Sequence, residues 1–164
     1  QPELAESRSL HSFYFTTDHI YETDDQELLE IGYQLNIAEW KVVVGNKVPE
    51  EAISTILYGT TPSDFWLNEQ ELFASNAFLK RLTELKGGWP EFIRYAKTCE
   101  QLANQGDPWG FAEHDSVGIR RAWTDGTALL KRATDPVLKA RVAYQLVRIA
   151  HYGGLPLQDF KVYT

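Results

Sequence analysis

Apolar residues recur every three or four positions along most of the chain, which is the period of an amphipathic helix. The first such stretch spans 25–44, where Asp24 or Asp25 can serve as the N-cap, and Gly45 ends it. A short helix begins near Pro49 and reaches Tyr58, because proline and acidic residues suit a first helical turn. Residues 63–86 fit one helix or two joined near 75–76, and we favour two.

The second half of the chain predicts three longer helices. One starts at Trp89 and Pro90 and shows a single apolar face as far as Gly106: Phe92, Tyr95, Ala96, Cys99, Leu102 and Ala103. Asp115 or Ser116 can cap the next helix, which extends to about 133, and Asp135 with Pro136 starts the last one, at 136–152. The short link between helices 117–133 and 136–152 predicts an antiparallel hairpin.

These elements predict an all-α fold built from antiparallel helical hairpins, arranged as a helical-repeat-like array or as a compact bundle. Residues 1–23 contain aromatic clusters but no sustained period, so we expect an irregular, acidic and aromatic N-terminal segment there. The helical domain is expected over 24–154. Residues 155–164 are expected to begin a further segment that is truncated.

Composition narrows the class of protein. The 164 residues are 43% hydrophobic and 24% charged, with five Trp, eight Tyr and eight Phe, which is typical of a folded globular chain. A single cysteine excludes an internal disulfide, and no apolar run approaches the length of a membrane span. Methionine is absent, even at position 1, so we expect the natural N-terminus to lie upstream or to have been removed. A cleaved secretory signal would explain this, and it favours an exported, periplasmic or cell-envelope location.

Charge is distributed unevenly along the chain, whose formal net charge is −7. Residues 1–30 hold eight acidic residues and one basic residue, and 31–115 hold twelve acidic and seven basic residues. Residues 116–164 reverse this balance, with eight basic and three acidic residues. Generic nucleic-acid binding is disfavoured by the net charge. Either the two ends pack against each other, which we favour, or each end faces a partner of opposite charge.

One stretch shows a resemblance. The sequence DPVLKARVAYQLVRIAHYG at 135–153, together with FIRYAK at 92–97, resembles segments of large, poorly characterised, exported α-helical bacterial proteins with tetratricopeptide-like helices. The resemblance implies the N-terminal part of an envelope protein with helical repeats downstream. It brings no catalytic residues with it.

Motifs for cofactors and metals are missing. The sequence contains no phosphate-binding glycine loop, no His-Glu-x-x-His and no paired Glu-x-x-His. We therefore predict no cofactor, no metal and no catalytic residue. His11, Asp18 and His19 are interpreted as plain surface residues in preference to a metal site. Cys99 is interpreted as a small buried residue, because it lies on an apolar helical stripe.

Two sets of residues are candidate binding sites. The first is the helix connection 107–116. Trp109 could serve there as a sugar-stacking or apolar platform, Glu113 or Asp115 could act as a general acid or base, and His114 adds an imidazole. The simpler reading is that its aromatic residues pack onto the core while Asp115 caps a helix, and we favour that reading. The second is a basic surface, since Arg120 and Lys131, like Arg121 and Arg132, are eleven residues apart and share a helix face. Arg141 and Arg148 repeat the pattern seven residues apart. These stripes could bind an acidic partner or a phosphate-rich surface, but we favour the interpretation that they are solvated or internally paired charges.

The tryptophans also invite a sugar-binding interpretation. Trp40, Trp66 and Trp123 lie within predicted helices and are expected in the core, whereas Trp89 and Trp109 lie at helix boundaries where exposure is easy.

Taken together, the sequence favours a non-enzymatic interaction or scaffold domain with an unidentified protein partner, as the N-terminal fragment of a larger exported envelope protein. Two alternatives stay open. One is a small acidic immunity or inhibitor protein that neutralises a basic partner. The other is a helical cell-wall glycan hydrolase that uses Glu113 or Asp115.

Overall fold

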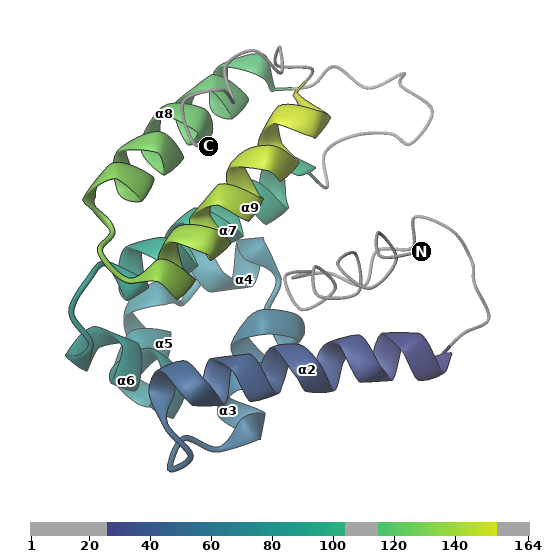
Figure 1. Cartoon of the computed structure of the whole chain (residues 1–164), viewed down its shortest axis with the longest axis vertical. Coiled ribbons are helices and arrows are strands. Elements are labelled where there is room, and N and C mark those ends of the chain that lie inside the picture. Colours follow the sequence, from purple (N-terminus) through teal and green to yellow (C-terminus); the bar gives the residue numbers. More distant parts are fainter. Residues whose placement is uncertain (1–25, 104–114, 154–164) are drawn as a thin grey trace. The chain divides into compact units, whose positions relative to one another are not determined.

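The computed structural model describes residues 26–103 and 115–153, and these residues form helices with no strand among them (Figure 1). The predicted all-α fold is confirmed for this part of the chain. The chain divides into two compact units, Gln1–Glu84 (unit 1) and Leu85–Thr164 (unit 2). The irregular segment predicted at 1–23 and the further segment predicted at 155–164 lie outside the described residues.

The described part of unit 1 begins with α2 (Gln26–Val44), which is the longest helix among the described residues of the unit. Its buried face carries Ile37, Trp40 and Val44, and the indole of Trp40 packs edge-on against Phe78 with ring centroids 5.1 Å apart. Gly45 ends the helix in a left-handed conformation with φ of 89°, which glycine adopts without a steric penalty. The predicted first helix, 25–44, is confirmed to within one residue.

Three short elements follow from residue 50 onwards. Helix α3 (Glu50–Ser54) continues directly into a wider π-type turn, η2 (Thr55–Gly59), so the predicted short helix to Tyr58 is present with an altered end. Ile53, Ile56 and Leu57 are buried along this segment. Helix α4 (Pro62–Leu67) comes next, with the Thr61 hydroxyl accepting a hydrogen bond from the Asp64 amide at 3.1 Å.

Helices α5 (Glu69–Ser75) and α6 (Ala77–Glu84) complete unit 1. The predicted break near 75–76 is confirmed, but a further break at Asn68 divides the stretch into three helices instead of two. Asn76 caps α6, because its Oδ1 accepts from the amides of Phe78 and Leu79 at 2.9 and 3.2 Å. Its Nδ2 also donates to the Ala52 carbonyl at 3.0 Å, so the cap ties α6 to α3.

Unit 2 consists of three helices in its described part: α7 (Trp89–Ala103), α8 (Ser116–Arg132) and α9 (Pro136–Tyr152). Each of them packs against the other two, and the predicted α8–α9 hairpin is confirmed (Figure 1). Asp115 caps α8 by accepting from the Gly118 amide at 2.8 Å. Asp135 caps α9 by accepting from the amides of Val137 and Leu138 at 2.8 and 3.1 Å.

Two glycines set the spacing between α7 and α8. A Cβ placed on Gly126 would collide with the Tyr95 hydroxyl, and a Cβ on Gly118 would lie 2.9 Å from the Leu102 side chain. Side chains of α7 therefore fill the space that these glycines leave open. The expectation that Cys99 is buried is confirmed, because it is fully enclosed in this core.

Two tryptophans differ from the sequence-based expectation. Trp89 is buried although it starts a helix, since it lies on the same apolar face of α7 as Phe92 and Ile93. Trp66 was expected in the core but is 38% exposed, because Phe65 beside it takes the buried position in the short helix α4. None of the described helices is long and apolar enough to cross a membrane.

Candidate functional site

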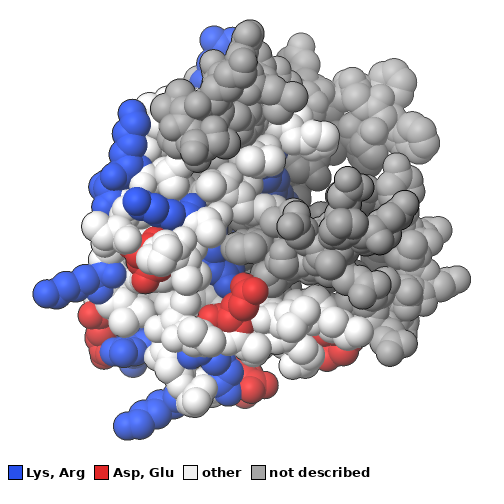
Figure 2. All heavy atoms as spheres, in the orientation of Figure 1, with Lys and Arg blue, Asp and Glu red and all other residues white. Residues whose placement is uncertain are grey.

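The outer face of α8 carries a concentration of positive charge. Arg120, Arg121, Lys131 and Arg132 are all exposed. The eleven-residue spacing aligns the members of each pair, and the two pairs lie about 100° apart, so the four residues fall within an arc of about 120° on the outer side of the helix. We call these four residues the α8 cationic face. Figure 2 shows Lys and Arg side chains protruding on the side of the molecule where α8 lies in Figure 1. All four residues belong to α8 (Ser116–Arg132), and whether they form a binding site stays a prediction.

A single acidic side chain, Asp125, accompanies this face within α8. The distance from Arg121 Nε to Asp125 Oδ2 is 4.0 Å, and the two side chains are 85% and 65% exposed. An ion pair at that distance and exposure contributes little, because water and salt screen it. The α8 cationic face therefore keeps a net positive charge that is directed to solvent.

A groove of about 320 Å³ adjoins this face within unit 2. It lies between α7 and α8, and its lining combines small apolar residues with charged and polar ones: Thr98, Gln101, Leu102, Asp115, Gly118, Arg121, Ala122 and Asp125. The predicted site residues Asp115 and Arg121 are thus brought to one groove. Sequence reasoning missed Thr98 and Gln101, whose only signal is that they are polar and lie outside the apolar stripe of α7.

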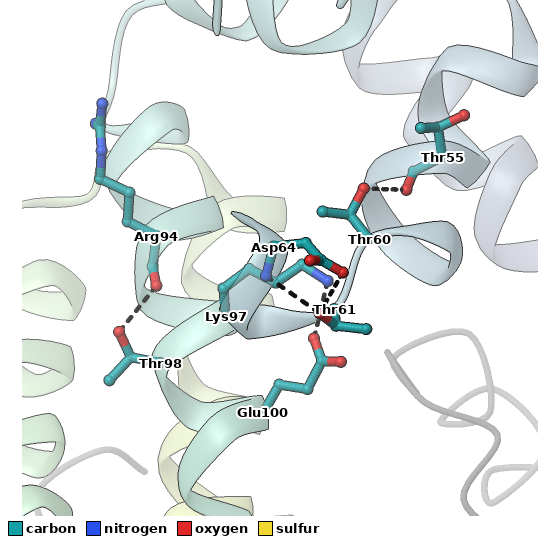
Figure 3. A network of polar contacts seen from close by, with 8 residues as sticks. All are labelled: Thr55, Thr60, Thr61, Asp64, Arg94, Lys97, Thr98 and Glu100. Atoms are coloured by element: carbon teal, nitrogen blue, oxygen red, sulfur yellow. Dashed lines mark hydrogen bonds and ion pairs between the residues drawn. The ribbon is translucent and has the colours of Figure 1, made fainter. Parts of the chain in front are cut away.

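The polar groups of the groove are partly engaged already. Asp115 holds the Gly118 amide, and the Thr98 hydroxyl donates to the Arg94 carbonyl at 3.0 Å (Figure 3). Asp115 and Asp125 are ten residues apart on one helix, which is about 15 Å along its axis. Paired carboxylates in glycoside hydrolysis lie roughly 5 to 9.5 Å apart. The groove therefore presents side chains suited to holding a polar segment, without a close carboxylate pair.

The predicted stripe of Arg141 and Arg148 is not formed. Arg141 is 1% exposed and its neighbour Gln145 is fully buried, so the expectation that this flank of α9 faces solvent is wrong. Helix α9 packs against both α7 and α8, and its buried positions extend beyond the apolar residues Leu138, Val142 and Ile149 to this polar flank. Arg148 is half-buried, close enough to Cys99 for its positive charge to act on the thiol.

A buried ion pair on α7 was not foreseen from the sequence. Lys97 Nζ lies 2.9 Å from Glu100 Oε2, with the two side chains only 2% and 8% exposed (Figure 3). Their i,i+3 spacing was the available signal, but it is shared by many exposed pairs. Breaking a buried ion pair is costly, so we interpret this pair as structural.

The one thiol of the chain is unsuited to nucleophilic chemistry. Burial raises the pKa of Cys99 to about 12, more than its contact with Tyr95 and the charge of Arg148 lower it. Burial also raises the pKa of the Tyr95 hydroxyl, and the neighbouring Cys99 adds to that effect. Because the thiolate is the reactive form, Cys99 stays protonated and inert in the folded unit.

Three predicted site residues, Trp109, Glu113 and His114, lie outside the described residues. Within 26–103 and 115–153, no group of three or more His, Cys, Asp or Glu side chains is arranged to hold a metal ion. The features that remain are the α8 cationic face and the groove beside it. No protein-family model matches the chain, and no significant match to a curated protein or to a solved structure was found.

Proposed function

We propose that the chain is a non-enzymatic protein-interaction module that binds an acidic segment of a partner protein on the α8 cationic face. The observation that carries this proposal is the grouping of four exposed cations on one helix with a single, weakly paired acid. The overall charge of −7 makes this local reversal of sign stand out. An acidic partner is attracted to this face and repelled by the acidic remainder of the chain.

The groove supports the same proposal. It continues from Arg121 to Gln101 of α7 and offers hydrogen-bonding groups beside the charges. Interfaces of this kind combine charged contacts at a rim with polar and small apolar contacts closer in. The hydrolase alternative draws no support from the groove, because Asp115 is occupied as a helix cap. We also propose, from the resemblance described above, that the module belongs to a larger exported envelope protein.

Binding of a defined acidic peptide tests the proposal. A fluorescein-labelled 20-residue Glu-rich peptide should bind at low salt and be released as the salt concentration rises. The double variant Arg120→Glu/Lys131→Glu should weaken binding roughly tenfold or more, since each lost charge contact contributes up to about 1 kcal/mol. The matched control is Lys47→Glu/Lys80→Glu, which changes the net charge equally at exposed positions of unit 1.

The outcomes separate the alternatives. Loss of binding in the α8 variant with retention in the control supports the proposal. Equal loss in both variants would mean that only net charge matters, which contradicts a defined site. Tighter binding of a DNA duplex than of the acidic peptide, with the same dependence on α8, would replace the protein partner with a nucleic acid.

A further inference from the structure

Helix α2 is apolar on two opposite faces. One face is buried in unit 1 through Ile37, Trp40 and Val44. The opposite face carries Ile31, Leu35, Ala38 and Val42, all of which are exposed; we call these four residues the α2 apolar stripe. The exposed fractions are 47% for Ile31, 48% for Leu35 and 85% for Val42. At 100° per residue the four side chains fall within an arc of about 60°.

The spacing of the α2 apolar stripe is that of a helix-pairing seam. Its residues follow one another at intervals of four, three and four, which is the a/d pattern of a heptad. Single exposed apolar residues are common on protein surfaces, but a continuous row at this spacing is what a second helix packs against.

The charges around the stripe indicate which helix would fit. Glu39 lies on one border, and on the other border Glu30 accepts a hydrogen bond from Gln34 at 2.7 Å. Lys41 is held by Glu50 at 2.8 Å, which offsets its charge. In sequence, 26–84 contains nine acidic and four basic residues. The stripe is therefore bordered by two carboxylates, within a stretch of chain that carries more acidic than basic side chains.

The acidic borders argue against a second copy of the chain and against residues 1–25 as the occupant of the stripe, and they favour a basic helix of another protein. A second copy of the chain would bring the same acidic borders face to face. Residues 1–25 hold six acidic residues and one basic residue, so they would be repelled as well. We propose that the α2 apolar stripe binds an amphipathic helix of another protein, with an apolar seam flanked by Lys or Arg. This surface lies in unit 1, so the proposal stands or falls independently of the α8 cationic face.

Thiol protection in the full chain tests the proposal. Cys99 is buried, so the variant Leu35→Cys places one accessible thiol in the middle of the stripe. The probe is a synthetic 21-residue helical peptide with Leu at a and d positions and Lys at e and g positions. A second peptide carries Glu at e and g. The matched control is Val147→Cys, since Val147 is 53% exposed on α9.

The proposal predicts that a maleimide modifies Leu35→Cys and Val147→Cys at similar rates in dilute free protein. The Lys-flanked peptide should slow modification at position 35 at least tenfold at saturation, while the Glu-flanked peptide and position 147 show no change. Leu35→Glu should abolish binding of the Lys-flanked peptide in a direct titration, without loss of helical circular dichroism. Val42→Cys provides a second reporter should Leu35→Cys fold poorly.

Each other result overturns the proposal. Slow modification of position 35 in dilute free protein would mean that the chain covers its own stripe. Protection that grows with protein concentration alone would indicate a second copy. Equal protection by both peptides, or protection of position 147 as well, would remove the stated charge preference and the defined site.

Discussion

At the residue scale, α7 and α8 can pack closely because Gly126 of α8 has no side chain. The Tyr95 hydroxyl occupies the place where a Cβ on Gly126 would be. From the sequence alone, a glycine within a helix is expected only to lower helix stability, by up to about 1 kcal/mol relative to alanine. In the structure, close packing of Tyr95 against Gly126 offsets this cost. The periodicity of apolar residues does not predict such a contact.

The substitution Gly126→Ala should therefore destabilise the protein although alanine is the better helix former. Forcing a methyl group against the Tyr95 ring should cost about 1–3 kcal/mol in the free energy of unfolding. Gly32→Ala is the matched control, because nothing lies within 4 Å of its Cβ direction, and it should gain up to about 1 kcal/mol. Urea unfolding of both variants measures the difference. Equal effects of the same sign would contradict the packing described here.

Cys99 gives the stability of unit 2 a dependence on alkaline pH. Burial holds the pKa of this thiol at about 12 in the folded protein, above the ordinary value of 9.0. Below pH 9 the thiol is protonated in both states and stability is unaffected. Between pH 9 and 12 only the unfolded chain ionises, so stability falls as pH rises.

From pH 8 to pH 10 the loss of stability through Cys99 should be on the order of 1 kcal/mol. Denaturant unfolding at the two pH values, on the parent chain and on Cys99→Ala, measures it. The variant should lose less stability over this interval by that amount. Identical losses in the two proteins would show that the thiol is not buried in the folded state.

At the element scale, helix ends were predictable where one capping side chain binds the backbone amides of the first turn. Asp135 was predicted as a cap, and Asp115 was one of two candidates with Ser116, because a short acceptor precedes a periodic apolar stretch; both aspartates accept hydrogen bonds from backbone amides. The break at Asn68 was not found, since its side chain forms no cap on α5 and the apolar period runs through it. The stripe on α2 was equally hidden, because a helix that is apolar on two faces shows no preferred side in sequence.

Asn76 should be the more costly cap to lose. Asn76→Ala removes two accepted hydrogen bonds at the start of α6 and the bond that joins it to the Ala52 carbonyl of α3, so we expect a loss of roughly 2–3 kcal/mol. Asp135→Ala removes only a local cap and should cost about 1 kcal/mol. Thermal unfolding of the two variants compares them. A larger effect at Asp135 would contradict the bridging role of Asn76.

At the scale of the whole molecule, the sequence predicted how charge is distributed along the chain, but it did not predict which charged side chains are buried. The described part of unit 2 holds ten basic and five acidic residues, in line with the basic C-terminal stretch seen in the sequence. Spacing predicted that Arg120 shares an azimuth with Lys131 and Arg121 with Arg132, and all four side chains are exposed on α8. It failed for Arg141, because only the tertiary packing of α9 against two helices decides that this polar flank is covered.

The most direct test of the proposed interaction is to map it residue by residue. Amide chemical shifts of the ¹⁵N-labelled chain, recorded while the Glu-rich peptide is added, should change mainly in 120–132 of α8 and around Gln101 on the groove. Shifts that cluster in unit 1, or that spread evenly over all exposed lysines and arginines, would contradict the account that the α8 cationic face is the docking surface.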